Sequence, residues 1–206
     1  MKVLAINGSP KAKGNTFHAL NTVCSSLLEE GIDSEIIHVG NKKISGCMAC
    51  HKCFETGRCI FNDELFDEWM EKMYAADGII LGTPVYYSGI NGTMKSFLDR
   101  AFFQKQRNFR HKLGASVAVL RRSGGVATFD QLNHYFTISE MPIVSSQYWN
   151  VIHGHTEGEV LMDYEALAAL KALGKNMAWL LKMIEATQNT IEKPKEQEII
   201  RTNFIR

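Results

Sequence analysis

Short apolar runs alternate with amphipathic stretches of helical spacing along most of the chain. Apolar runs bounded by polar or glycine-containing segments predict buried strands, and apolar residues three or four positions apart predict helices. We expect strands at residues 3–6, 34–39, 78–82 and 115–120, with a fifth between residues 142 and 152. We expect helices at residues 16–30, 92–103, 128–140 and 164–187, and another that follows Asp63.

This alternation of strands and helices is typical of an α/β protein. Strands separated by helices predict a five-stranded parallel sheet with helices on both faces. Ligands of such open sheets bind beyond the carboxyl ends of the strands. The loops after the first, third and fourth strands are therefore the expected place for chemistry.

Two of the predicted helices carry apolar faces that should pack on the sheet. Asp63 is a suitable N-cap for the second helix. One side of that helix carries Leu65, Phe66, Trp69, Met70 and Met73. The apolar stripe of the first helix consists of Phe17, Leu20, Cys24, Leu27 and Leu28. On this stripe, Cys24 is interpreted as a buried, inert thiol.

Composition and charge narrow the class of protein. The chain has 206 residues, 45% of them hydrophobic, which is enough for one domain with a full core. We predict a domain at residues 1–190 and a polar tail at residues 191–206. The 23 basic residues nearly balance the 22 acidic ones, so we expect no nucleic-acid and no membrane partner. No apolar run resembles a signal-peptide core or a membrane span, which predicts a cytoplasmic protein.

The segment GSPKAKGNT joins the first strand to the first helix. Gly8 and Gly14 permit tight bends, and the polar side chains lie beside the free amides of a helix N-terminus, which suits a phosphate dianion. The segment matches neither G-x-G-x-x-G nor the P-loop pattern. It therefore predicts a site for a single phosphate, and a polar turn that caps the helix is the alternative. The polar residues are Ser9, Lys11, Lys13, Asn15 and Thr16.

The segment GTPVYYSGINGTMK follows the third strand, and another glycine-bearing loop, RRSGG, follows the fourth. Pro84 stiffens the longer loop, and Tyr86 and Tyr87 offer flat apolar faces with polar tips. Gly89 leaves the backbone open to a planar ligand. A ring system rich in carbonyls and ring nitrogens fits this combination, and plain packing of the two tyrosines is the alternative.

Four of the five cysteines lie close together in GCMACHKCFETGRC. Cys47, Cys50 and Cys53 have the spacing of a ferredoxin cluster loop, and Cys59 follows after five residues. A reducing compartment disfavours structural disulfides and favours metal or redox roles. Structural zinc sites usually take two cysteine pairs that lie a dozen or more residues apart. A metal cluster, a metal-free thiol loop and adventitious zinc all stay open on the residues alone.

Together these segments resemble a known family. GSPKAKGNT, GTPVYYSGINGTMKSFLDR and the compact cysteine loop between them resemble the flavodoxin-fold NAD(P)H-dependent FMN reductases, specifically their iron-sulfur flavoprotein branch. The resemblance covers residues 1–100 and extends more weakly through RRSGG and the last helix. It implies a flavodoxin-like fold and an enzyme that takes hydride from NAD(P)H on FMN.

The resemblance also implies which residues bind FMN. The phosphate would be held by Ser9, Lys11, Gly14, Asn15 and Thr16. The isoalloxazine would be lined by Pro84, Val85, Tyr86, Tyr87, Ser88 and Gly89, with Gly124 and Gly125 at its far edge. No side chain is assigned a catalytic role, because the flavin carries the hydride chemistry.

For the cysteine loop, the resemblance implies a 4Fe-4S cluster held by Cys47, Cys50, Cys53 and Cys59. Such a cluster would pass electrons singly to a small-molecule acceptor or a ferredoxin-like protein. Members of the family commonly form dimers or tetramers with FMN near a subunit interface. The resemblance therefore implies a homodimer or homotetramer.

Two other functions are alternatives to an FMN-dependent reductase. A flavodoxin-like electron-transfer protein would bind FMN without turnover, but such carriers tend to be strongly acidic, and the net charge here is +1. A zinc-stabilised, non-enzymatic binding module would leave the phosphate loop and the RRSGG loop empty. The sequence indicates neither the electron acceptor nor a preference between NADH and NADPH.

Overall fold

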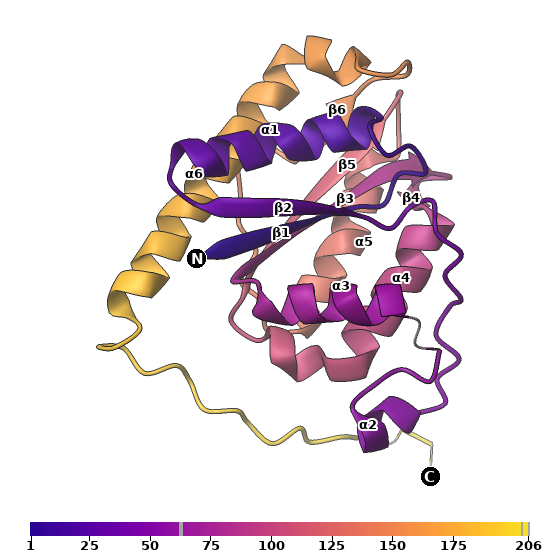
Figure 1. Cartoon of the computed structure of the whole chain (residues 1–206), viewed down its shortest axis with the longest axis vertical. Coiled ribbons are helices and arrows are strands. Elements are labelled where there is room, and N and C mark those ends of the chain that lie inside the picture. The colour runs from indigo at the N-terminus through magenta and orange to yellow at the C-terminus, as the bar shows by residue number, and fades with distance from the viewer. Residues whose placement is uncertain (62–63, 203, 206) are drawn as a thin grey trace.

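The computed structural model describes residues 1–61, 64–202 and 204–205. Five parallel strands lie in the order β2-β1-β3-β5-β6, and the short β4 pairs antiparallel with β3 (Figure 1). The strands are β1 (Lys2–Asn7), β2 (Asp33–His38), β3 (Gly78–Tyr86), β4 (Gly89–Ile90), β5 (Leu113–Leu120) and β6 (Val151–His153). The predicted flavodoxin-like α/β fold with a five-stranded parallel sheet is confirmed.

Helices cover both faces of this sheet (Figure 1). One face carries α1 (Asn15–Glu29) and α6 (Tyr164–Thr187), and the other carries α3 (Glu64–Ala75), α4 (Gly92–Lys105) and α5 (Gly125–Ile138). Alternate residues of β1 face the two layers: Val3 and Ala5 pack towards α1 and α6, whereas Leu4 and Ile6 pack towards the other helices. Burial on both faces explains why the strands are nearly continuous apolar runs.

Several boundaries differ from those predicted. The prediction that α5 begins at residue 128 was wrong: Gly124 adopts a left-handed backbone with φ 91° and starts the helix at Gly125. The Thr128 hydroxyl donates to the Gly124 carbonyl oxygen at 2.9 Å, within the first turn. The strand β6 occupies the end of its expected interval and extends one residue past it. The elements absent from the prediction are α2 (Lys52–Thr56), η1 (Gln106–Phe109), η2 (Glu159–Met162) and the β3–β4 hairpin.

Of the residues on the predicted apolar faces, Phe17 is half-buried, Leu28 and Leu65 are exposed, and the others are buried. Leu28 is 66% exposed, because it lies about 100° around the helix from Leu27 and faces away from the sheet. Leu65 is also exposed, so its inclusion in the inward face of α3 was wrong. Cys24 is buried as predicted, and burial raises the pKa of its thiol. The predicted N-cap Asp63 lies outside the described residues.

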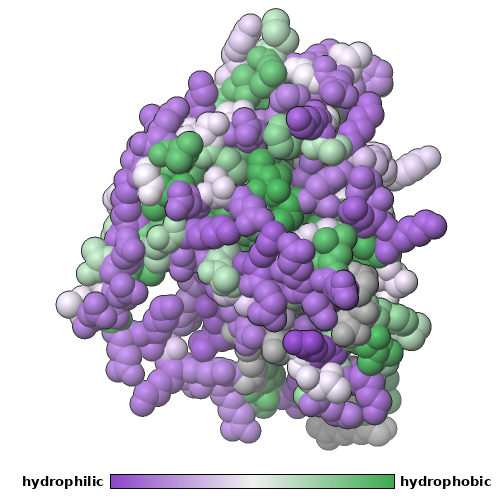
Figure 2. All heavy atoms as spheres, in the orientation of Figure 1, coloured by the Kyte–Doolittle hydropathy of each residue, from purple (hydrophilic) through white to green (hydrophobic). Residues whose placement is uncertain are grey.

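The face seen in Figure 2 is mostly hydrophilic, with hydrophobic groups in separate patches. None of the described helices has the length and apolar character needed to cross a membrane. After α6, residues 188–202 contain no helix or strand. Glu196 and Ile199 of this tail share a small cavity with Arg110 and Glu140, so the tail lies against its own chain there.

Candidate functional site

The loop between β1 and α1 forms one wall of the candidate site. The helix α1 begins at Asn15, no described side chain caps its first turn, and that turn contains no acidic residue. Free amides at a helix N-terminus carry positive partial charge. This end of α1 is therefore suited to an anion such as a phosphate.

Buried side chains fix the shape of this loop. Asn7 is fully buried; its Oδ1 accepts from the Ser9 amide at 3.0 Å, and its Nδ2 donates to the Ala12 carbonyl at 3.2 Å. His38 Nε2 lies 2.7 Å from the Ser9 carbonyl oxygen. The Ser9 hydroxyl oxygen accepts from the Lys11 amide at 3.2 Å, so its proton remains the group that Ser9 can offer a ligand.

Two glycines in the loop allow close packing. Neither Gly8 nor Gly14 has a positive φ, so the predicted bends do not depend on the left-handed region. A Cβ at Gly8 would meet the Met94 side chain at 2.8 Å, and a Cβ at Gly14 would meet the Lys11 Cβ at 2.9 Å. The absence of side chains lets the loop lie directly against α4 and against itself.

A cavity of about 220 Å³, here called the phosphate cavity, lies at the carboxyl ends of the strands. It brings together the predicted residues Ser9, Lys11, Gly14, Asn15, Thr16, Pro84, Val85 and Tyr86. Its lining also includes residues that sequence reasoning missed, namely Leu120, Arg121, Gly154, His155 and Glu157. The first two lie at the end of β5, and the other three follow β6. A precise position for β6, the fifth parallel strand, would have pointed to Gly154, His155 and Glu157.

The Asn15 side chain is engaged within the protein. Its Nδ2 donates to the Thr156 carbonyl at 2.9 Å, and its Oδ1 accepts from the Gly158 amide at 2.8 Å. The same turn is closed by Glu159, whose pKa is lowered by hydrogen bonds from the amides of Thr156 and His155. Asn15 therefore positions the turn beside the cavity, and its backbone amide is the group that can face an anion.

The β3–β4 hairpin has a two-residue turn formed by Tyr87 and Ser88. Their φ values are 49° and 57°, the left-handed conformation that a type I′ turn requires and that residues other than glycine rarely adopt. The Tyr87 side chain is fully exposed at the tip, whereas Tyr86 lines the phosphate cavity. The structure thus separates the two tyrosines that the sequence prediction grouped together.

The hairpin packs against the start of α5. A Cβ at Gly124 would meet the Ser88 Oγ at 2.7 Å, and a Cβ at Gly89 would meet Gln131 Oε1 at 3.0 Å. Gln131 Nε2 also donates to the Ser88 carbonyl at 3.4 Å. Gly124 and Gly125 therefore lie beside the hairpin, although the cavity that they line is a second one, of about 460 Å³.

Asn91, which sequence reasoning did not single out, connects the loops. It is 3% exposed, and its Nδ2 donates to the Gly8 carbonyl. Its Oδ1 accepts from the Met94 amide at 2.8 Å, as an N-cap of α4, and its own amide donates to Thr83 Oγ1 at 3.4 Å. One buried side chain therefore ties the phosphate loop, β3 and α4 together.

The clustered cysteines surround a small cavity of about 20 Å³, to which Cys47, Cys50, Cys53 and Cys59 all contribute. Burial raises the pKa of the Cys53 thiol, and the other three thiols add to the rise. In residues 1–61, 64–202 and 204–205, no three or more His, Cys, Asp or Glu side chains are arranged to hold a metal ion. The donor set fits an iron-sulfur cluster by its chemistry, because four cysteine thiolates are the usual ligands of such clusters.

Two residues of α4 anchor the cysteine loop. Gln104 Oε1 accepts from the Cys59 amide at 2.9 Å. Arg100 is 3% exposed, donates to the Phe61 carbonyl, and holds its guanidinium 3.9 Å from the centroid of the Phe66 ring. The loop is thus fixed to the same helix whose N-terminus contacts the phosphate loop.

These observations define a flavodoxin-like α/β protein with a candidate anion site at the N-terminus of α1 and a four-cysteine loop between β2 and α3. Residues 1–156 match the model of the NADPH-dependent FMN reductase family, and the chain belongs to this family of flavin-dependent NAD(P)H oxidoreductases. The family resemblance inferred from the sequence is confirmed.

Relatives of similar length are named iron-sulfur flavoproteins, the branch that the sequence resembles. An iron-sulfur flavoprotein of Methanocaldococcus jannaschii is 35% identical over 193 residues, covering 90% of this chain and all of the relative. One of Archaeoglobus fulgidus is 32% identical over 206 residues, covering 93% and 100%. Among solved structures, RosB with a bound 8-demethyl-8-formylriboflavin-5′-phosphate has a TM-score of 0.74 at 14% identity, covering 100% of this chain and 92% of RosB. An archaeal flavodoxin has a TM-score of 0.60 at 15% identity, covering 88% and 99%. These last two show the fold.

Proposed function

We propose that the protein binds FMN with its phosphate in the phosphate cavity, takes hydride from NAD(P)H, and passes electrons to a small-molecule or protein acceptor. One observation carries the proposal: an uncapped helix N-terminus and the end of β3 meet at a single cavity on the carboxyl edge of the sheet. This is the position at which open α/β sheets bind phosphorylated ligands.

Each wall of the cavity has a distinct task in this proposal. The first turn of α1 and the Ser9 hydroxyl donate hydrogen bonds to the phosphate, and Lys11 adds positive charge. Pro84 and Tyr86 offer flat, apolar surface to the ring system. When bound, FMN supplies hydride acceptance and an iron-sulfur cluster supplies single-electron transfer.

The cysteine loop is proposed to hold a 4Fe-4S cluster through Cys47, Cys50, Cys53 and Cys59. All four thiols are free and share one cavity, and the relatives of this chain are named iron-sulfur flavoproteins. The Gln104 contact fixes the backbone beside Cys59, which reduces the loss of conformational freedom when the loop closes on a metal group.

The flavin site is tested by replacing Asn15 and Tyr86 with alanine together. Loss of the Asn15 contacts frees the neighbouring turn and loss of the Tyr86 ring removes one wall, so the purified protein should retain far less FMN while staying folded. The matched control replaces exposed Asn21 and exposed Tyr164 with alanine. Equal FMN content in the parent, the site variant and the control would show that the pocket is elsewhere.

The cluster is tested by Cys50→Ser, with Cys24→Ala as the control. Anaerobically purified Cys50→Ser should lose its iron and keep its FMN, and Cys24→Ala should keep both. Iron content equal to the parent in Cys50→Ser would contradict the proposed cage. Bleaching of the flavin band by NADPH or NADH distinguishes a reductase from a flavodoxin-like carrier.

A further inference from the structure

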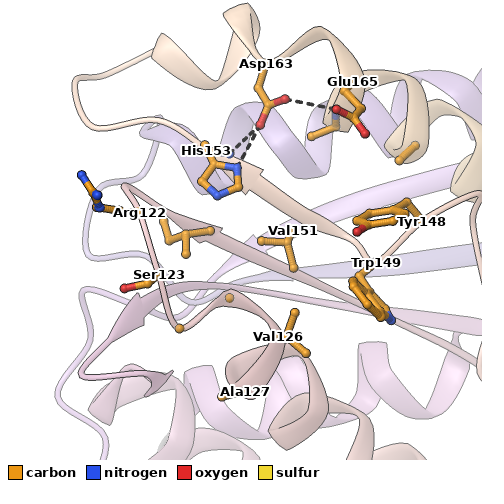
Figure 3. A pocket seen from close by; sticks show the side chains of 15 residues that line it. Arg122, Ser123, Val126, Ala127, Tyr148, Trp149, Val151, His153, Asp163 and Glu165 are labelled. Carbon is orange, nitrogen blue, oxygen red and sulfur yellow. Dashed lines mark hydrogen bonds and ion pairs between the residues drawn. The ribbon is translucent and has the colours of Figure 1, made fainter.

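The second cavity, here called the edge pocket, lies beside β6 at the edge of the sheet and has a volume of about 460 Å³. Its walls are the start of α5, the segment before β6, the end of β6 and the start of α6 (Figure 3). Apolar walls with a few polar groups at this volume are typical of small-molecule sites. The FMN proposal leaves this pocket without a ligand.

An aromatic surface forms one end of the edge pocket. The rings of Tyr148 and Trp149 lie 4.9 Å apart between centroids, at an interplanar angle of 58°. They are 63% and 52% exposed, and both rings lie at the same end of the pocket in Figure 3. Exposed aromatic faces beside a cavity suit a flat, nitrogen-rich ring, which stacks on them.

The opposite end of the edge pocket is suited to an anion. Arg122 and Ser123 lie there, away from the two aromatic rings, with the exposed Arg122 guanidinium turned outward at the rim (Figure 3). The adjoining first turn of α5 contains no acidic residue, and no described side chain caps it. By contrast, Asp163 caps α6, because its carboxylate accepts from the Ala166 amide at 3.1 Å. An arginine beside an uncapped turn favours a phosphate group.

Hydrogen-bonding side chains line the middle of the edge pocket. His153 Nδ1 lies 3.2 Å from Asp163 Oδ2, which also accepts from the His153 amide at 2.9 Å. The other ring nitrogen of His153 is turned towards the pocket in Figure 3. Glu165 adds an exposed carboxylate on the aromatic side, away from Arg122. A ribose, whose hydroxyls both donate and accept, matches these groups.

The edge pocket adjoins the phosphate cavity. Leu120 lines both of them. A third cavity of about 240 Å³ lies between them, because it shares His153 and Asp163 with the edge pocket and Arg121 and His155 with the phosphate cavity. A long ligand can therefore place its anionic group at the Arg122 end of the edge pocket and extend from there towards the proposed flavin site.

We propose that the edge pocket binds the adenosine diphosphate half of the nicotinamide dinucleotide. Adenine stacks on Trp149, the ribose hydroxyls meet His153 and Glu165, and the pyrophosphate meets Arg122 and the first turn of α5. The inference rests on the proposed function, which requires a nicotinamide reductant. It also accounts for a chain that uses a dinucleotide but contains no G-x-G-x-x-G sequence.

The test measures binding of ADP-ribose, which lacks the nicotinamide, to FMN-saturated protein by isothermal titration calorimetry. Trp149→Ala should weaken the affinity roughly tenfold, as expected for loss of one stacked base. Arg122→Gln should weaken it by a similar factor and make it less sensitive to salt. The matched controls are Trp179→Ala, which removes another tryptophan that is 61% exposed, and Arg201→Gln in the tail, and neither should change the affinity.

A filling variant gives an independent measurement. Ala127 is an exposed lining residue on α5, so Ala127→Phe should occupy the pocket without disturbing the core and should abolish ADP-ribose binding. Ala186→Phe, at an exposed position near the end of α6, is its control and should bind normally. The same Ala127 variant should raise KM for NADH more than it lowers kcat, because the edge pocket holds a part of the substrate that does not react.

Two results separate the failure of this inference from failure of the proposed function. Parent-like ADP-ribose affinity in the Trp149, Arg122 and Ala127 variants would overturn the edge-pocket assignment, even if FMN is present and NADH bleaches it. Protein without FMN that still binds ADP-ribose in a Trp149-dependent way would refute the flavin proposal and retain the pocket.

Discussion

Replacement of Asn91 tests how the candidate site is held together. Its side chain caps α4 through the Met94 amide at 2.8 Å and donates to the buried Gly8 carbonyl. Loss of an N-cap costs about 1 kcal/mol. Loss of a hydrogen bond that leaves a buried carbonyl unpaired costs about 1–3 kcal/mol more. We therefore expect Asn91→Ala to lower the free energy of unfolding by about 2–4 kcal/mol.

Asn91→Ser divides this loss into its two parts. Serine is a good N-cap but is too short to reach Gly8, so it should recover about 1 kcal/mol of the alanine loss. Both variants should also bind FMN more weakly, because the Gly8 carbonyl and the phosphate loop lose their anchor to α4.

The assay is urea unfolding of the FMN-free protein, with the exposed helix residue Asn21→Ala as the control. Equal m-values for all forms would show that the variants change stability and not the extent of unfolding. The control should stay within about 0.5 kcal/mol of the parent. An Asn91→Ala loss inside that range, or full recovery by serine, would refute the role given to the Gly8 contact.

Two further predictions concern charged side chains. Hydrogen bonds from Lys2 and Lys72 lower the pKa of the Glu35 carboxyl, so its contribution to stability is present above the unfolded pKa and is lost as the pH falls through the folded pKa. Glu35→Gln should cost roughly 1 kcal/mol near pH 7, and its difference from the parent should vanish in acid unfolding titrations; a gap that persists at low pH would contradict the ion-pair explanation. Arg100→Met should lower stability by about 1.5–3 kcal/mol, because it removes a charged hydrogen bond to the Phe61 carbonyl. It should also lower the iron content, and a protein with unchanged urea midpoint and iron would show that Arg100 does not anchor the cysteine loop.

The sheet could be predicted because its central strands are buried on both faces. Ile79, Ile80 and Leu81, for example, form an apolar run that cannot belong to an amphipathic surface element. The edge strand β6 has only three residues, too few for a periodic signal, so its start could not be fixed. Because the end of β6 was also not fixed, the turn after it could not be located. Gly154 and His155 were therefore not assigned to the phosphate cavity.

Other parts of the site depend on contacts that a sequence pattern does not contain. The hairpin turn at Tyr87 and Ser88 was missed because neither residue is among those that favour positive φ. Asn91 was missed because Gly8, its partner, is 83 positions away in the chain. The sequence pattern located the loops at the ends of the strands, whereas the side chains that join those loops could be identified only in the structure.

The helix α4 contacts both candidate sites, which has a consequence for electron transfer. Asn91 joins its beginning to the phosphate loop, and Gln104 joins its other end to Cys59. At 1.5 Å per residue, the 14 residues of α4 span about 21 Å. An inserted residue would turn one attachment by about 100° relative to the other. The length of α4 therefore fixes the distance between the phosphate loop and the cysteine loop, and with it the spacing of the two proposed redox groups.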